Sequence, residues 1–322
     1  MADKSELIQR IKELKEERGA VIMAHYYTLP EIQDIADYIG DSLALAQIAS
    51  RIEEPVIVLC GVNFMADTAK ILCPDKTVLL PDLEAGCSLA DSCPAPEFEK
   101  FVKSHPGHTV ISYVNTSAEV KALSDILVTS GNARKIVDSF PQDEKIIFGP
   151  DRNLGNYINS VTGREMLLWD GACHVHEKFS VEKLAELKKQ YPNAKVLAHP
   201  ECKKPILLLA DVVGSTAALL KAATDAPEGS EFIVVTESGI LHEMQRLCPD
   251  KTFIPAPPDA VGDSEPETTD GIGCGCNNCA YMKLNTLEKL AACLENMSPQ
   301  IEVDPEIAEK ARKPIQRMLD RS

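Results

Sequence analysis

Cysteines recur at the same place in three related stretches of the chain. Cys87 and Cys173 are 86 residues apart, and each follows a predicted strand. Cys274, Cys276 and Cys279 stand in the equivalent place in the last third of the chain. One cysteine from each stretch could therefore meet the others at a common centre and hold a metal through three thiolates. Three thiolates leave one position open on a tetrahedral zinc or on a four-iron cluster, which is typical of a Lewis-acid site.

The remaining cysteines have a simpler interpretation. The chain has 11 cysteines spread over 322 residues, so a disulfide scaffold of the small secreted type is not expected. Cysteine is often buried as a small apolar side chain, and this is also the alternative reading of the recurring ones. We expect this packing role for Cys60, Cys73, Cys93, Cys202, Cys248 and Cys293.

Polar side chains that could bind anions or move protons stand at matched positions in the same three stretches. In each stretch the first and last positions are 17 residues apart, at 25 and 42, 113 and 130, and 199 and 216. The hydroxyl residues at the ends of the stretches are also typical helix N-caps, a role compatible with anion binding. The candidates are His25, Tyr27, Tyr113, Asn115, His199 and Glu201 near the starts, and Ser42, Ser130 and Thr216 at the ends.

His176 is a further candidate, because it follows Cys173 by three residues and must lie near any metal bound there. A surface histidine is the alternative.

The repeat indicates how the chain is divided. The three stretches begin 88 and 86 residues apart, which is too long for a solenoid and predicts three related domains. The segment Cys-Pro-Asp-Lys-Thr at 73–77 returns at 248–252, which supports an internal duplication. We place an N-terminal helix at 1–18 and α/β units at 19–106, 107–192 and 193–322, the last including the C-terminal helices.

Within each unit, short apolar runs alternate with helical patterns. The alternation predicts small parallel sheets with helices on both faces, so that ligands would bind beyond the carboxyl ends of the strands. In the first unit, a capping box at Thr28 predicts a helix to about Ile39, followed by a helix capped by Asp41 or Ser42. A capping box is likewise expected from Thr116 to Glu119. The predicted strands are 20–24, 55–59, 77–80, 110–112, 145–148, 165–169, 195–198, 232–235 and 252–254.

One segment of the third unit has no counterpart in the first. Residues 255–273 are rich in Pro, Asp, Gly and Thr and show no apolar period. Because a long irregular loop in a compact protein is usually functional or disordered, we interpret this segment as a lid.

Composition excludes several classes of partner. The formal net charge is −16 and there is no basic block, so we expect no nucleic-acid partner, and any anionic substrate must be held by local donors. No apolar run approaches the ~18 residues of a membrane span, and the charged start of the chain is not a signal peptide. A cytoplasmic protein without membrane association is therefore expected.

The ordered set of motifs resembles the quinolinate synthase family, over nearly the whole chain. One departure is Gly273, which stands where many members of the family have the first cysteine of a CxxCxxC motif, while this chain has Cys274. The motifs that carry the resemblance are Ala24-His25-Tyr26-Tyr27, Gly40-Asp41-Ser42, Ala85-Gly86-Cys87-Ser88-Leu89-Ala90, Tyr113-Val114-Asn115, Trp169-Asp170-Gly171-Ala172-Cys173-His174-Val175-His176, His199-Pro200-Glu201-Cys202 and the run from Cys276 to Asn285.

The resemblance implies a fold and a cofactor. The fold would be three pseudo-symmetric three-layer α/β/α domains arranged as a triangle around a central cluster. That cluster would be one [4Fe–4S] per chain, held by Cys87, Cys173 and Cys279, with one iron open. Cys274, Cys276 and Cys202 are not ligands in this reading, and a redox role for them stays open.

The resemblance also implies a reaction, the condensation of iminoaspartate with dihydroxyacetone phosphate to quinolinate in de novo NAD biosynthesis. Phosphate and two waters would be released, and the open iron would act as a Lewis acid. The enzyme would be coupled to a producer of iminoaspartate, L-aspartate oxidase or dehydrogenase. Tyr27, His176 and Glu201 are the candidate general acids and bases, and the other strand-end and helix-start residues would bind the substrates.

Two readings of other classes stay open. A zinc-dependent lyase could use the same three thiolates, and metal analysis would identify it. A non-catalytic iron–sulfur carrier or sensor would more naturally use four cysteine ligands, and would not need His, Tyr and Glu on the open side.

Overall fold

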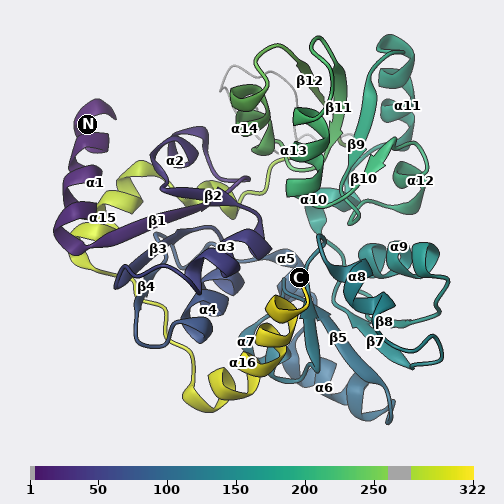
Figure 1. The fold of residues 1–322 in the computed structure, drawn as a ribbon, viewed down its shortest axis with the longest axis horizontal. Coiled ribbons are helices and arrows are strands. Elements are labelled where there is room, and N and C mark those ends of the chain that lie inside the picture. Colours follow the sequence, from purple (N-terminus) through teal and green to yellow (C-terminus); the bar gives the residue numbers. More distant parts are fainter. Residues whose placement is uncertain (1–3, 260–276) are drawn as a thin grey trace.

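The computed structural model describes residues 4–259 and 277–322. In these residues the chain forms three four-stranded sheets in which all neighbouring strands are parallel, each flanked by helices. Figure 1 shows the three sheets grouped around a common centre, with the first at the left, the second below and the third above. The predicted α/β class with three repeated sheets is confirmed.

The first sheet has the strand order β2-β1-β3-β4. It is built from β1 (Ala20–His25), β2 (Tyr38–Gly40), β3 (Val56–Cys60) and β4 (Thr77–Leu79), with α1 (Lys4–Arg18), α2 (Pro30–Ile35), α3 (Ser42–Ala49) and α4 (Asn63–Leu72).

The second sheet repeats this order as β6-β5-β7-β8. Its strands are β5 (Thr109–Tyr113), β6 (Ile126–Val128), β7 (Ile146–Gly149) and β8 (Leu167–Leu168). The helices between Ser88 and Gln190 are α5 (Ser88–Asp91), α6 (Ala95–Lys103), α7 (Ala118–Ala122), α8 (Ala133–Asp138), α9 (Arg152–Thr162), α10 (His174–Glu177) and α11 (Val181–Gln190).

The third sheet has the order β10-β9-β11-β12. Its strands are β9 (Lys195–Ala198), β10 (Val212–Val213), β11 (Glu231–Val235) and β12 (Thr252–Pro255), and its helices are α12 (Lys204–Leu207), α13 (Thr216–Thr224) and α14 (Ile240–Leu247). Most of the segment interpreted as a lid, residues 260–273, lies outside the described residues, as do Cys274 and Cys276.

Each sheet has a short edge strand that the sequence analysis did not predict. The prediction of one helix from Thr28 to about Ile39 is wrong, because α2 ends at Ile35 and the strand β2 follows it. Pairing with the central strand accounts for the difference, since Tyr38–Gly40 pair with Met23–His25. The strands β6 and β10 occupy the same position in the other two sheets. Tertiary pairing therefore overrides the helical pattern expected in the first unit.

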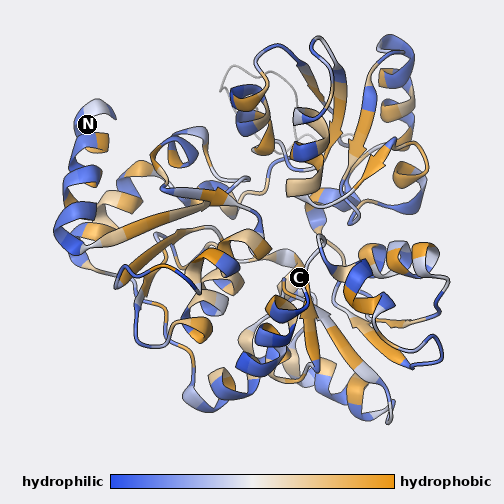
Figure 2. Ribbon diagram, viewed as in Figure 1, coloured by the Kyte–Doolittle hydropathy of each residue, from blue (hydrophilic) through white to orange (hydrophobic). Residues whose placement is uncertain are grey.

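The core follows from this layering. Figure 2 shows apolar residues along the strands and on the helix faces turned to them, with polar residues outside. Every residue of β1 and of β3 is buried. Parallel strands covered on both faces read as continuous apolar runs, and this explains why their positions could be predicted. No helix among the described residues is long and apolar enough to cross a membrane.

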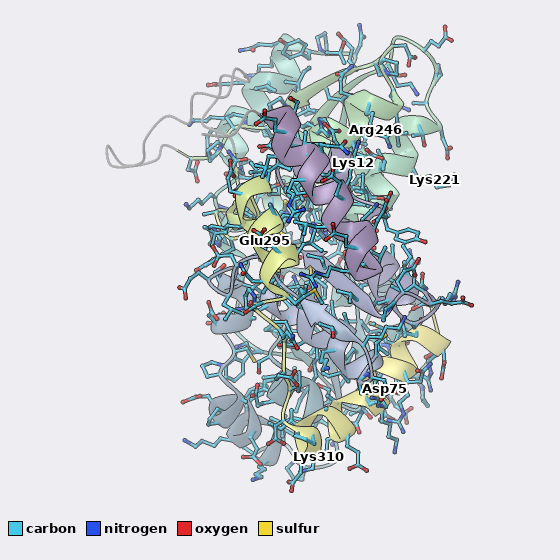
Figure 3. All side chains as sticks on the ribbon, turned by 90° about the vertical axis from the view of Figure 1, so that its left-hand side faces the viewer. Lys12, Asp75, Lys221, Arg246, Glu295 and Lys310 are labelled. Carbon is cyan, nitrogen blue, oxygen red and sulfur yellow. The ribbon has the colours of Figure 1, made fainter. Side chains whose placement is uncertain are left out.

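The C-terminal helices leave the third sheet and return to the other two. After η1 (Met282–Leu284), α15 (Leu287–Asn296) packs against α1, and Arg10 forms an ion pair with Glu295 at 3.1 Å. Figure 3 shows these two helices side by side. The last helix, α16 (Pro305–Asp320), packs against α4, α7 and β6 and so joins the first and second sheets (Figure 1).

Candidate active site

The carboxyl ends of strands from all three sheets face one cavity, with about 720 Å³ of empty space including its mouth. Every residue that the sequence analysis selected for the site lines it: His25, Tyr27, Ser42, Cys87, Tyr113, Asn115, Ser130, Cys173, His176, His199, Glu201, Thr216 and Cys279. The repeat thus brings together residues that are far apart in the chain. The other described cysteines, Cys60, Cys73, Cys93, Cys202, Cys248 and Cys293, are free and buried, as expected.

The three cavity cysteines share one local arrangement. Cys87 is the N-cap of α5 and Cys173 the N-cap of α10, while Cys279 lies just before η1. In each case backbone N–H groups two or three residues further on donate to the sulfur, and these bonds favour the thiolate. The thiols are only partly buried as residues, so they remain accessible from the cavity.

The thiols also lie close enough to influence one another. Burial, with a contribution from Cys279, raises the pKa of Cys87 to about 12. Burial and then Glu237 raise the pKa of Cys279 to about 11, and burial, Glu201 and Cys87 raise the pKa of Cys173 well above its ordinary value. A bound cationic group would reverse this effect and deprotonate the thiols. The donor set therefore fits a metal or iron–sulfur group bound by three thiolates.

A second donor set overlaps the first. The ligand atoms of Cys173, His176 and Glu201 all lie within 4.8 Å of one another. Sulfur, imidazole nitrogen and carboxylate oxygen are all ligands that zinc accepts.

Glu201 is the centre of a buried polar group. One of its carboxylate oxygens accepts a hydrogen bond from the Tyr113 hydroxyl at 2.6 Å, and the other lies 3.1 Å from Nδ1 of His176. Nδ1 of His199 lies 3.6 Å from the carboxylate, and the rings of the two histidines are stacked with centroids 4.8 Å apart. All four side chains are almost completely buried.

The charge state of this group follows from its contacts. Burial opposes the carboxylate form of Glu201, but His176, His199 and the Tyr113 hydroxyl outweigh it and lower the pKa of Glu201 to about 2. Burial lowers the pKa of His199 to about 3, and burial with the nearby His199 and Lys283 lowers that of His25 to about 3. At neutral pH, Glu201 is therefore an anion, whereas His25 and His199 are neutral.

The two neutral histidines are oriented by the same kind of local hydrogen bond, from the backbone N–H two residues further on. Nδ1 of His25 accepts the backbone N–H of Tyr27 at 3.1 Å, and Nδ1 of His199 accepts that of Glu201 at 3.4 Å. A neutral imidazole that accepts at Nδ1 carries its proton on Nε2. Nε2 of His199 lies 3.2 Å from the Ser130 hydroxyl. The repeat thus sets the tautomer as well as the position of both rings.

A second hydrogen-bonded chain leads away from His176. Its Nε2 lies 3.0 Å from the Thr236 hydroxyl, which lies 2.7 Å from the hydroxyl of Tyr27. The Tyr27 hydroxyl also lies 2.9 Å from that of Thr216. Burial raises the pKa of Tyr27 well above its ordinary value, so this phenol keeps its proton. Tyr27, Thr236 and His176 therefore form a connected chain of hydrogen-bonding groups.

The hydroxyls of Ser42, Ser130 and Thr216 do not cap their helices. Asp41, one of the two caps predicted for α3, does cap it, and Ser215 caps α13, which leaves Ser42 and Thr216 at the first helical position. Asn132 stands at the cap of α8, two residues after Ser130. The hydroxyls of Ser42, Ser130 and Thr216 line the cavity instead. In α7 the cap is Ser117 rather than the predicted Thr116.

Four further residues were missed by sequence reasoning: Thr236, Glu237, Asp151 and Lys283. Thr236 and Glu237 directly follow β11, and Asp151 follows β7 by two residues. The sequence does carry a signal for two of them. Asp151 and Glu237 lie at the carboxyl ends of parallel strands and are 86 residues apart, which is the repeat period.

Comparison with known proteins shows which family the chain belongs to. The family described as "Quinolinate synthetase A protein" matches residues 9–320. The quinolinate synthase of Thermosynechococcus vestitus is 56% identical over 317 residues, covering 98% of this chain and 96% of the relative. That of Synechocystis sp. is 56% identical over 314 residues, covering 98% and 95%, and that of Chloroherpeton thalassium is 55% identical over 317 residues, covering 98% and 95%. The chain belongs to the quinolinate synthetase A family.

Proposed function

We propose that the chain condenses iminoaspartate with dihydroxyacetone phosphate to give quinolinate, phosphate and two waters. The observation that carries the proposal is a single cavity that holds three convergent cysteines beside the buried pair of Glu201 and His176. Relatives that carry the name quinolinate synthase and match nearly the whole chain support it. The product is a precursor of NAD in de novo biosynthesis.

Cys87, Cys173 and Cys279 would hold one [4Fe–4S] cluster per chain and leave one iron without a protein ligand. When bound, this group supplies a Lewis acid that polarises a substrate oxygen. The fit rests on the three thiols that line one cavity and accept N–H groups from the helix starts that follow them.

The reaction needs several proton transfers, and the buried polar group suits them. Glu201 is anionic at neutral pH and can take a proton as a general base. His176 lies 3.1 Å from it and can carry protons on to Thr236 and Tyr27. Tyr27 keeps its own proton and can donate it, or a hydrogen bond, to a developing oxyanion.

Both substrates are anions, while the chain carries a net charge of −16. We therefore expect neutral hydrogen-bond donors in the cavity wall, rather than an overall positive charge, to bind the anionic substrates. His25 and His199 present Nε2–H groups, and the hydroxyls of Ser42, Ser130 and Thr216 lie at or near helix starts. Tyr113 contributes its ring to the wall. The side-chain oxygen of Asn115 is buried and has no hydrogen-bond partner among the described residues, so it is suited to a substrate N–H or hydroxyl.

The setting of the reaction follows from its chemistry. Iminoaspartate is an imine that water hydrolyses, so an enzyme that oxidises aspartate, an L-aspartate oxidase or dehydrogenase, must supply it continuously. All nine described cysteines are free, which suits a reducing compartment, and we place the protein in the cytoplasm.

The test is quinolinate formation by anaerobically purified protein, given dihydroxyacetone phosphate and freshly generated iminoaspartate. Turnover is expected for the wild type and is lost in Cys87→Ala, Cys173→Ala and Cys279→Ala. Cys293→Ala is the matched control, since Cys293 is buried in α15 away from the cavity. Wild-type protein that carries an intact cluster but makes no quinolinate would reject the assignment.

The overlapping set of Cys173, His176 and Glu201 favours one second candidate, a zinc-dependent lyase. Metal analysis of anaerobically purified protein separates the two. Zinc without sulfide, and activity restored by zinc alone, would support the lyase, whereas iron and acid-labile sulfide support the synthase.

A further inference from the structure

We infer that Asp151 and Glu237 are positioning residues that fix the backbone of Cys173 and Cys279, and that Lys283 connects Glu237 to Tyr27. The inference deepens the proposed function and depends on it in one respect, namely that these thiols hold an iron–sulfur group. None of the three residues was selected from the sequence.

The two carboxylates occupy the same place in two sheets. Asp151 lies two residues after the end of β7, and Glu237 lies two residues after the end of β11. They are 86 residues apart, which is the repeat period, and their exposed fractions are 0% and 1%. Buried carboxylates are costly unless they are hydrogen-bonded, so their contacts should show what they are for.

Both carboxylates bridge a strand end and a cysteine. One oxygen of Asp151 accepts the N–H of Leu154 at 2.7 Å, and the other accepts the N–H of Cys173 at 3.2 Å. One oxygen of Glu237 accepts the N–H of Gly239 at 2.6 Å, and the other accepts that of Cys279 at 3.0 Å. In each case one oxygen ties the residue to its own turn, and the other holds the cysteine backbone.

The first sheet does without such a carboxylate. The equivalent position, two residues after β3, is Val62. There the N–H of Asn63 donates to the carbonyl of Ala85 at 2.8 Å, two residues before Cys87. The same backbone bond recurs in the other two units, from Arg152 to Gly171 at 2.8 Å and from Ser238 to Asn277 at 3.2 Å. In the second and third units the carboxylates therefore add a second link to the cysteine, beside the backbone bond that all three units share.

Glu237 has a further partner that Asp151 does not share. Nζ of Lys283 lies 3.1 Å from the Glu237 oxygen that accepts the Cys279 N–H, and it donates to the Tyr27 carbonyl at 2.7 Å. The packing is close, since a Cβ added at Gly239 would meet Lys283 Nζ and the Tyr27 Cα at 2.8 Å. Lys283 thus joins the third cysteine to Tyr27, across the boundary between the first and third sheets.

These contacts predict three different phenotypes. Asp151→Asn and Glu237→Gln each leave one side-chain oxygen to accept two backbone N–H groups. The cysteine backbone should then be held less firmly, and iron should leave the bound cluster faster. Lys283→Met leaves the Cys279 N–H bonded but releases the Tyr27 carbonyl, so it should slow turnover without loosening iron. Glu237→Gln should show both effects, because its carboxylate contacts both Cys279 and Lys283.

The experiment measures iron release to a chelator from the anaerobically reconstituted holoenzyme, together with kcat and KM. Release at least tenfold faster than in the wild type is expected for Asp151→Asn and Glu237→Gln. Glu243→Gln is the matched control, because Glu243 is a buried carboxylate that pairs with Arg246 on α14 and should keep the wild-type rate. Lys283→Met should lower kcat at least tenfold with wild-type iron release, and Lys283→Arg should restore part of kcat.

The outcome that overturns the inference is iron release from both carboxylate variants at the rate of the Glu243→Gln control. Wild-type kcat in Lys283→Met would overturn the link to Tyr27. If Glu237→Gln does not fold, Asp151→Asn and Lys283→Met test the two parts separately. Wild-type protein that binds iron and sulfide but makes no quinolinate would reject the proposed function alone, whereas wild-type protein that binds no iron would reject both.

Discussion

The hydroxyl of Tyr113 donates a hydrogen bond of 2.6 Å to the carboxylate of Glu201, although the two residues belong to different sheets. Tyr113 ends β5, and Glu201 follows β9 by three residues. Both lie at carboxyl ends of central strands, so the bond crosses from one unit to the next. It stabilises the anionic form of Glu201 and fixes its orientation towards His176.

Glu201→Gln should abolish the proposed general base while it preserves the volume of the side chain. Removing a positioned acid or base typically costs about 10²–10⁴-fold in rate, so kcat should fall by that factor. Tyr113→Phe removes only one hydrogen bond to a charged group, worth about 1.5–3 kcal/mol, so kcat should fall by roughly 10–100-fold. Iron content should stay at the wild-type value in both. Wild-type kcat in Glu201→Gln would exclude Glu201 as the base.

Thr236 is predicted to relay protons between His176 and Tyr27, since its hydroxyl lies 3.0 Å from the former and 2.7 Å from the latter. Thr236→Val is close to isosteric and removes the hydroxyl, so kcat should fall by about tenfold or more, as for one lost buried hydrogen bond. Thr236→Ser keeps the hydroxyl and should stay near the wild type. Equal kcat values for the Val and Ser variants would show that the hydroxyl is not used.

The residues of the site could be predicted because of the repeat. A single histidine such as His25 carries little information, but three matched stretches that end strands in one kind of sheet place their polar residues at one centre. The structure brings all of them to one cavity. Their individual roles are a different matter, because a role depends on contacts such as that between Glu201 and His176, which no spacing in the sequence expresses.

The edge strands could not be predicted from periodicity. Tyr38–Gly40 is too short for a period, and short apolar runs fit a helix and a strand equally well. One signal was nevertheless present. Asp37, Asp125 and Asp211 precede the edge strands, and each accepts an N–H of the central strand, at 2.8, 2.8 and 2.7 Å respectively. An aspartate that recurs with the repeat before an apolar pair would have indicated the turn into β2, β6 and β10.

Asp151 and Glu237 were missed for a related reason. The predicted site residues follow the first strand of each unit, whereas these two follow the third, β7 and β11. The first unit has Val62 at that position, so the pattern is present in only two of the three copies. A carboxylate that holds a backbone N–H also leaves no mark in composition, because it looks like any surface acid.

Ile315 should be important for stability, since α16 joins the first and second sheets and Ile315 is fully buried on its inner face. Ile315→Ala leaves a cavity and should lower the free energy of unfolding by about 2–5 kcal/mol. Lys313→Ala, an exposed position on the same helix, should change it by at most about 0.5 kcal/mol. Urea unfolding of the two variants checks this. Equal midpoints would mean that α16 contributes little to the contact between the sheets.

Lys121 gives the fold a pH dependence that unfolding measurements can detect. It is fully buried in α7, with its Nζ bonded to the Thr116 carbonyl and 5.4 Å from the centre of the Phe64 ring. Burial lowers the pKa of Lys121 from 10.5 to about 8, against the opposing effects of Asp67, Cys87 and Glu119. Between these two pH values the unfolded chain holds a proton that the folded chain has lost.

The free energy of unfolding should therefore rise with pH over this interval through Lys121, and Lys121→Met should lack that contribution. The difference in unfolding free energy between wild type and Lys121→Met should grow in favour of the wild type by at most about 1.4 kcal/mol per pH unit above about pH 8. Lys310→Met is the control, because Lys310 is exposed on α16 (Figure 3) and should follow the wild-type curve. Urea unfolding from about pH 7 to about pH 10 measures all three. Parallel curves for wild type and Lys121→Met would show that Lys121 keeps its proton in the folded chain, held by the Thr116 carbonyl and Asp67.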